Sequence, residues 1–149
     1  MPAGKSVRIV LADDHQVVRR GLQLVLDLEP DFTVVGQASD IASARTMVRA
    51  HEPDVLVLDL HMPGGSVFEA IPTLRVESPN TQIVVLTMEA NAASVRAARS
   101  AGALGYVIKE AAESDLADAV RQAAAGETYL NRRMASELAV QLMQADGYD

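Results

Sequence analysis

The fold is decided by the stretch Val55-Leu56-Val57-Leu58-Asp59, in which four apolar residues lead directly into a carboxylate. Further short apolar runs lie at residues 7–11, 32–36, 82–86 and 104–108, and three of the five runs are almost continuously hydrophobic. Such runs are typical of strands that are buried on both faces of a parallel sheet. The sequence therefore predicts five strands that belong to one sheet.

The segments between these runs carry helical patterns. Apolar residues recur there at helical spacing, and polar residues that favour helix starts precede two of the segments. Five strand-then-helix units in one short chain indicate an α/β fold, a doubly wound five-stranded parallel sheet with right-handed crossovers. The helical spacing is clearest at Val18, Leu22, Val25 and Leu26 and at Leu116, Val120 and Ala123, and the candidate caps are Asp40 and Asn91.

Two helices depart from this regular pattern. Pro72 falls inside the third expected helix, which should cover residues 67–76. An interior proline costs about 3 kcal/mol, so we expect this helix to kink near Ile71 or to begin late. A helical pattern also follows residue 126 and predicts an extra C-terminal helix at residues 131–143, with an apolar face of Ala135, Leu138, Ala139 and Leu142.

The composition excludes several classes of protein. The 149 residues are 49% hydrophobic and 22% charged, as in ordinary globular domains, and no cysteine is present for a disulfide or a thiolate metal site. A membrane span needs about 18 consecutive apolar residues, and no stretch of the sequence is that long. The first residues also lack the apolar core of a signal peptide, so we expect a cytoplasmic protein. A net charge of −7 and a set of only five aromatic rings (three Tyr, two Phe) argue against direct nucleic-acid binding.

Polar side chains follow the apolar runs at the points where the strands should end. Because ligands bind at the carboxyl ends of parallel strands, these side chains should meet at one edge of the sheet. They are Asp13 and Asp14 after the first run, Asp59 and Thr87 at the ends of the third and fourth, and Lys109 after the fifth. Clustered carboxylates suit a hard cation such as Mg²⁺, and the cation and Lys109 would stabilise a phosphoryl group that arrives at one carboxylate. Asp59 is the best candidate acceptor because its strand is central.

Each of these residues also has an ordinary structural explanation. A single aspartate can cap a helix or form a turn, and a strand-end threonine or a lone lysine is usually structural or solvated. His15, His51 and His61 are more typical of surface residues than of metal ligands, because none has a second histidine at ligand spacing. A functional site is nevertheless the better explanation, because five polar residues fall together at one sheet edge although they belong to four separate loops.

Four motifs together resemble those of a response-regulator receiver domain. The resemblance covers residues 7–126, and residues 101–109 and 126–130 are similar to the NarL/FixJ (LuxR-type) subgroup, in which a linker helix and a helix-turn-helix domain follow the receiver. The motifs are Leu11-Ala12-Asp13-Asp14-His15, Leu58-Asp59-Leu60-His61-Met62-Pro63-Gly64, Val85-Leu86-Thr87 and Ala101-Gly102-Ala103-Leu104-Gly105-Tyr106-Val107-Ile108-Lys109. The resemblance implies a flavodoxin-like (βα)5 receiver domain at residues 1–126 and a linker helix or tail at residues 127–149.

The resemblance also implies a role for each site residue. Asp59 would accept a phosphoryl group from a phosphohistidine of a sensor histidine kinase, and Lys109 and Thr87 would contact the phosphoryl oxygens. Tyr106 would move inward as Thr87 moves, and Glu89 and His61 would tune the hydrolysis rate. The ligands of Mg²⁺ would be Asp13, Asp14, Asp59 and the backbone carbonyl of His61.

As a receiver, the chain would be a signalling switch rather than an enzyme. It would form a homodimer on activation and would reach DNA only through an output domain that this sequence lacks. We therefore expect either a piece of a transcription regulator or a stand-alone receiver. The predicted C-terminal helix would dock on its own domain or take part in dimer formation or domain swapping.

Two positions depart from the family pattern. Val67 stands eight residues after the acceptor, where the family usually has glycine, and Glu110 follows Lys109, where many receivers have proline in a cis bond. A cis bond before a residue other than proline costs about 2.5–4 kcal/mol, so we expect a trans bond before Glu110. These changes leave the acidic residues in place and bear on loop geometry and dephosphorylation rate.

Three other interpretations compete with the switch. A haloacid-dehalogenase-like phosphatase also uses an aspartate nucleophile, but that family has a second aspartate where this chain has His61. A flavin-binding domain would need a phosphate-binding loop after the first strand, where Asp13 and Asp14 would repel phosphate. A pseudo-receiver that is never phosphorylated and acts only as an interaction module stays open, although the complete set of acidic, threonine and lysine residues argues against it.

Overall fold

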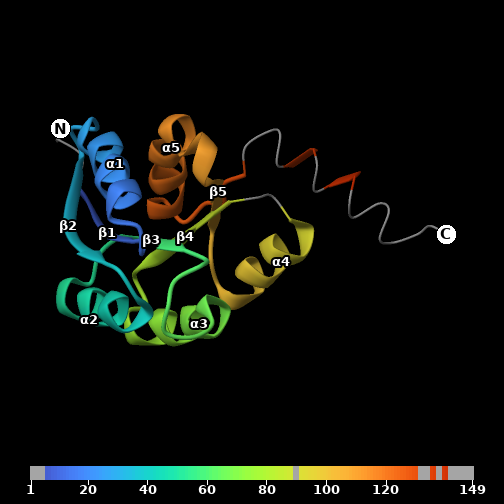
Figure 1. The fold of residues 1–149 in the computed structure, drawn as a ribbon. Helices are drawn as coiled ribbons and strands as arrows, with labels where there is room; N and C mark the ends of the chain where they lie inside the picture. The colour runs from blue at the N-terminus through green and yellow to red at the C-terminus, as the bar shows by residue number, and fades with distance from the viewer. Residues whose placement is uncertain (1–5, 89–90, 131–134, 137–138, 141–149) are drawn as a thin grey trace.

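The computed structural model describes residues 6–88, 91–130, 135–136 and 139–140. Strands and helices alternate along the chain (Figure 1). The strands are β1 (Val7–Ala12), β2 (Phe32–Ala38), β3 (Val55–Asp59), β4 (Gln82–Thr87) and β5 (Gly105–Ile108). The helices are α1 (Gln16–Asp27), α2 (Ile41–His51), α3 (Val67–Glu77), α4 (Ala92–Ala101) and α5 (Ala112–Ala124), and a short 3-10 helix, η1 (Lys109–Ala111), joins β5 to α5.

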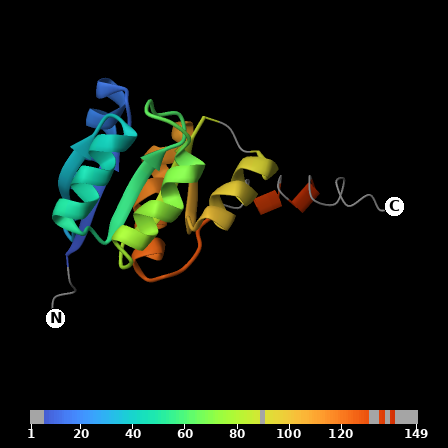
Figure 2. The same cartoon turned by 90° about the horizontal axis from the view of Figure 1, so that it is seen from below.

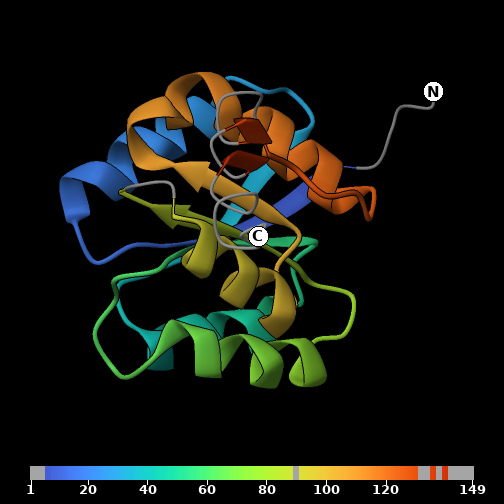
Figure 3. The same cartoon turned by 90° about the vertical axis from the view of Figure 1, so that its right-hand side faces the viewer.

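The five strands form one parallel sheet in the order β2-β1-β3-β4-β5. Helices α1 and α5 cover one face of the sheet, and α2, α3 and α4 cover the other (Figures 1 and 3). Figure 2 looks onto the layer of α2, α3 and α4. The predicted doubly wound, flavodoxin-like fold is confirmed, and in the part of the chain described here no helix has the length and apolar character needed to cross a membrane.

The central strand β3 explains why the deciding stretch is apolar on both sides. Val55 and Val57 pack into the core under α1 and α5, whereas Leu56 and Leu58 pack into the core under α2, α3 and α4. Burial of each such side chain contributes about 1.5–3 kcal/mol relative to exposure. The strand therefore holds its last residue, Asp59, in a fixed place at the carboxyl edge of the sheet.

The two predicted capping residues form the expected hydrogen bonds at the starts of α2 and α4. The Asp40 carboxylate accepts a hydrogen bond from the Ser43 backbone amide at 2.7 Å, and the Ser43 side chain in turn contacts the Asp40 amide. Asn91 accepts from the Ser94 amide at 3.1 Å in the same way. These caps satisfy backbone donors that the first turn leaves free.

The expectation that the third helix begins late is wrong. Helix α3 begins at Val67 and continues to Glu77 with Pro72 inside it. Pro72 itself is exposed, and Val67 and Ile71 anchor the buried face of the helix in the core. Burial of that face offsets the cost of the proline. The kink near Ile71 stays a prediction.

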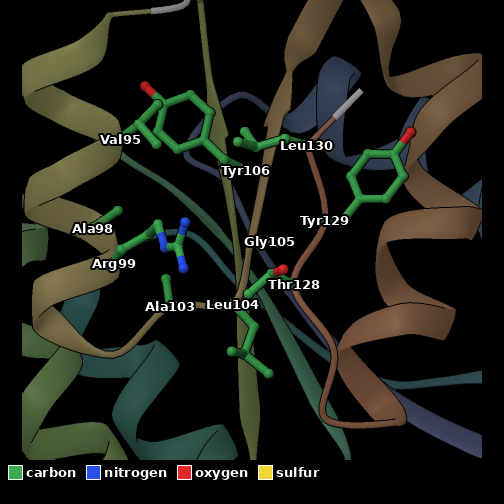
Figure 4. Close-up of a pocket in the computed structure, with 10 residues that line it drawn as sticks. All are labelled: Val95, Ala98, Arg99, Ala103, Leu104, Gly105, Tyr106, Thr128, Tyr129 and Leu130. Carbon is green, nitrogen blue, oxygen red and sulfur yellow. The ribbon is translucent and has the colours of Figure 1, made fainter. Parts of the chain in front are cut away.

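The chain after α5 returns along the free edge of β5. Tyr129 pairs with Gly105 in a parallel bridge, its amide donates to the Leu104 carbonyl at 3.1 Å, and the Tyr106 amide donates to its carbonyl at 3.2 Å. In Figure 4 the Tyr129 ring lies on the α5 side, whereas Leu130 points toward Tyr106. The predicted C-terminal helix lies largely outside the described residues, which in that segment are only Ala135, Ser136, Ala139 and Val140, all exposed.

The position of Tyr129 predicts an unusual alkaline titration. Burial, and then the nearby charges of Asp115 and Asp118, raise the pKa of Tyr129 to about 12. Because the folded state favours the neutral phenol, this contribution to stability is complete below the ordinary pKa of 10.0 and is lost as the pH rises toward 12. Tyr129→Phe should therefore lose less stability than the parent between these pH values, as measured by urea unfolding. Equal losses in the two proteins would contradict this assignment.

Candidate functional site

The carboxyl ends of the strands bring four of the predicted site residues to one edge of the sheet. Asp13 follows β1, Asp59 ends the neighbouring strand β3, Thr87 ends β4, and Lys109 begins η1 directly after β5. Their positions follow from the parallel order of the strands, because every strand ends at the same edge. Asp14 lies next to Asp13 at the start of the loop that leads to α1.

Asp13, Asp59 and Lys109 form a tight charged cluster. The ammonium nitrogen of Lys109 lies 2.9 Å from Oδ2 of Asp13 and 3.1 Å from Oδ2 of Asp59. Both aspartates are completely buried, and the lysine side chain is only 12% exposed. One ammonium thus faces two buried carboxylates, and the cluster keeps a net negative charge.

Backbone amides hold both carboxylates in place. The His15 amide donates to Oδ1 of Asp13 at 2.8 Å, and the His61 amide donates to Oδ1 of Asp59 at 3.0 Å. Each aspartate thereby shapes the loop that follows its own strand. The oxygens left facing Lys109 are the two Oδ2 atoms, so the loops and the lysine orient the acids together.

The electrostatics of the pocket leave room for a further cation. Burial lowers the pKa of Lys109, but attraction to the carboxylates of Asp13 and Asp59 outweighs burial and raises this pKa above its ordinary value. The lysine is therefore firmly charged. This one ammonium is shared by Oδ2 of Asp13 and Oδ2 of Asp59. Two buried carboxylates that share a single positive group leave negative charge that a further cation can offset.

The acidic residues have the chemistry of a divalent-cation site. One ligand atom from each of Asp13, Asp14, His15 and Asp59 can lie within 4.8 Å of all the others. The three carboxylates supply the oxygen ligands that Mg²⁺ prefers, and the partly exposed Asp14 leaves a path for water. The sharing of one ammonium, that of Lys109, between Asp13 and Asp59 fits the same interpretation.

The remaining predicted residues differ in burial, and one of them is not among the described residues. Thr87 is 3% exposed at the end of β4, the strand next to Asp59. Tyr106 is buried and lies between β5 and α4, beside Val95 and Leu130 (Figure 4). The side chain of His61 is exposed, and Glu89 lies outside the described residues. The described peptide bonds include no cis bond, so the bond before Glu110 is trans as expected.

His15 is a neighbour of the acidic cluster that the sequence did not indicate. Its pattern predicts a surface residue, and its side chain is indeed 65% exposed. Its Nδ1 atom nevertheless lies 3.1 Å from Oδ1 of Asp14 and 3.4 Å from Oδ1 of Asp13. The direct succession of two aspartates and a histidine is the signal that could have indicated this contact.

The sequence and the fold match known proteins. A family model described as the response regulator receiver domain matches residues 9–121. The oxygen regulatory protein NreC of Staphylococcus carnosus is 38% identical over 96% of this chain and 66% of its own length. The DNA-binding transcriptional activator DevR/DosR of Mycobacterium tuberculosis is 39% identical over 93% of this chain and 64% of its own length. The chain thus spans about two thirds of the length of these curated relatives.

Solved structures agree with the sequence matches. A two-component response regulator of the LuxR family from Aurantimonas sp. SI85-9A1 superposes with a TM-score of 0.87, at 32% identity, over 93% of this chain and 99% of that one. The isolated REC domain of RcsB from Salmonella enterica serovar Typhimurium, solved with the phosphomimetic BeF3-, gives a TM-score of 0.81 at 28% identity, over 90% of this chain and 99% of that one.

Proposed function

Because the chain belongs to the response regulator receiver family, we propose that Asp59 accepts a phosphoryl group from a phosphohistidine of a sensor histidine kinase. The observation that carries the proposal is the buried cluster in which Lys109 joins the carboxylates of Asp13 and Asp59 at the end of the central strand. In the transfer, an Asp59 carboxylate oxygen forms a bond to phosphorus as the phosphorus–nitrogen bond breaks and the imidazole leaves. The chain gains an acyl phosphate and keeps it as a signal.

Each residue of the pocket would have a separate role in this transfer. Asp13, Asp14, Asp59 and the backbone carbonyl of His61 would hold Mg²⁺, which when bound offsets charge on the phosphoryl oxygens. Lys109 supplies a fixed positive charge 3.1 Å from Oδ2 of Asp59. The His61 amide keeps the acceptor carboxylate oriented. The protein needs no general base, because positioning and cations suffice for this chemistry.

The added group would switch a surface rather than release a product. A phosphoryl group adds about −1.5 to −2 charges and strong acceptor oxygens. Thr87 would turn its hydroxyl to these oxygens, and we propose that Tyr106, which is 2% exposed in this structure, takes its inward position as Thr87 moves, with consequences for the surface of α4 and β5. We further propose that His61 and Glu89 tune the hydrolysis rate of the acyl phosphate.

The partners follow from the same family membership. We propose a cytoplasmic switch that forms a homodimer on activation and acts on DNA through a separate output domain. Two observations support this: the relatives are about half as long again as this chain, and one of them is named a DNA-binding transcriptional activator. We propose residues 1–126 as the receiver and residues 127–149 as the linker toward such a domain.

Incubation with a small phosphodonor tests the proposal. With Mg²⁺ and acetyl phosphate, the intact mass of the chain should rise by one phosphoryl group, because acetyl phosphate, like phosphohistidine, readily donates its phosphoryl group to a nucleophile. A sample with excess chelator should show no gain. A folded chain that gains nothing in the presence of Mg²⁺ would favour the pseudo-receiver, which binds partners without phosphorylation.

A further inference from the structure

His15 occupies a position at the acidic site that neither phosphoryl acceptance nor helix capping explains. It is the residue before α1, but its side chain makes no capping hydrogen bond. Its backbone amide is instead fixed by Oδ1 of Asp13 at 2.8 Å, which sets where the ring can lie. The Nδ1 atom then sits 3.1 Å from Oδ1 of Asp14 and 3.4 Å from Oδ1 of Asp13.

These separations suit ligands of a single ion. Adjacent ligand atoms around an octahedral ion with bonds of about 2.1 Å lie about 3.0 Å apart, close to the nitrogen–oxygen separation at Asp14. The ligand atoms of Asp13, Asp14, His15 and Asp59 all fall within 4.8 Å of one another. The charges also favour a cation, because the single ammonium of Lys109 lies 2.9 Å from Asp13 and 3.1 Å from Asp59 and so faces two buried carboxylates.

We propose that His15 is a side-chain ligand at this site and makes it favour divalent cations that accept imidazole nitrogen. The inference rests on the cation site of the proposed function but not on phosphoryl transfer. Mg²⁺ gains little from a nitrogen ligand, whereas affinity for nitrogen rises along the series Mn²⁺, Co²⁺, Ni²⁺. The contribution of His15 should therefore grow in the same order.

A rival explanation is an ion pair, in which protonated His15 binds Asp14 and contacts no cation. The two side chains are 65% and 30% exposed, and exposed pairs contribute little to stability. The rival also makes a different prediction. Removal of a positive ring would strengthen the binding of every cation by a similar factor, since the effect would be one of charge alone.

Calorimetric titration of the untagged chain with each metal chloride at fixed pH distinguishes the two. His15→Ala should change the Mg²⁺ affinity by less than about twofold, weaken Mn²⁺ about threefold, and weaken Co²⁺ and Ni²⁺ about tenfold or more. Pulsed electron paramagnetic resonance of bound Mn²⁺ should show coupling to a nitrogen nucleus in the parent and none in His15→Ala. His15 is largely exposed, so this variant should fold normally.

His51 serves as the matched control. It lies at the far end of α2, so His51→Ala should keep the parent's graded affinities and its nitrogen coupling. An equal change for all four cations in His15→Ala, or the same graded loss in His51→Ala, would overturn the proposal. Binding of no cation by the parent would overturn the cation site and this proposal together. Graded binding in a chain that takes no phosphoryl group would refute the proposed function and support this inference.

Discussion

Asp59→Asn should abolish phosphoryl uptake from acetyl phosphate. The amide keeps the shape of the side chain but cannot act as the carboxylate nucleophile, so no acyl phosphate can form at this position. The neighbouring Asp13 keeps its contact with Lys109, and the variant should remain folded because only one of two buried negative charges is lost. Intact mass under conditions that phosphorylate the parent measures the effect, and circular dichroism verifies the fold.

Asp27→Asn is the matched control for this experiment. Asp27 ends α1 and is exposed, so its replacement makes the same chemical change at a position away from the pocket. This variant should gain one phosphoryl group as the parent does. Continued phosphorylation of Asp59→Asn at the parent's rate would show that another residue is the acceptor.

Lys109→Met should destabilise the chain strongly in the absence of Mg²⁺. The variant keeps the apolar stem but leaves the completely buried Asp13 and Asp59 without a cation. Removal of one partner from a buried ion pair costs about 3–5 kcal/mol, and the partial exposure of this pocket places the loss near the lower end. Urea unfolding measures the free energy, and phosphoryl uptake should also fall because the fixed positive charge is gone.

Magnesium should restore part of that loss. A divalent cation held by the same carboxylates replaces some of the missing charge, so the free energy of unfolding should recover more with Mg²⁺ in Lys109→Met than in the parent. A second variant, Asp13→Asn combined with Lys109→Met, should be less sensitive to Mg²⁺ because one buried charge has been removed. An identical deficit with and without Mg²⁺ would show that the carboxylates do not bind the cation.

The pH dependence of the lysine's contribution has a definite sign. The pKa of Lys109 is raised in the folded chain, so its stabilisation is complete below the ordinary value of 10.5 and is lost only as the pH rises through the higher folded value. The stability difference between the parent and Lys109→Met should therefore persist throughout the neutral range.

The alternation of strands and helices could be predicted because its signals are local. The apolar run that ends at Asp59 reflects burial on two faces, and Asp40 and Asn91 cap helices through contacts a few residues away. The convergence of polar side chains at one edge could also be expected, since it follows from a parallel sheet. Pro72 could not be treated correctly, because its tolerance depends on which face of α3 is exposed.

The contact of His15 with the acids depends on geometry that the sequence does not show. The Asp13 carboxylate accepts a hydrogen bond from the His15 backbone amide, and the His15 ring lies against Asp14. The parallel bridge between Tyr129 and Gly105 likewise joins residues whose pairing no local pattern indicates. The His15 contact and the Tyr129–Gly105 bridge both depend on the path that the chain takes after leaving a strand or helix, which the local sequence does not encode.

The identity of the phosphorylated residue is the most direct test of the account. Borohydride reduction of the chain after treatment with Mg²⁺ and acetyl phosphate converts an acyl phosphate into an alcohol that survives digestion. Trypsin then places Asp59 in the peptide of residues 50–75 and places Asp13 and Asp14 in the peptide of residues 9–19. The account predicts that fragmentation finds the reduced residue at position 59 alone. Reduction at position 13 or 14, or at no position in a folded chain with Mg²⁺ present, would contradict it.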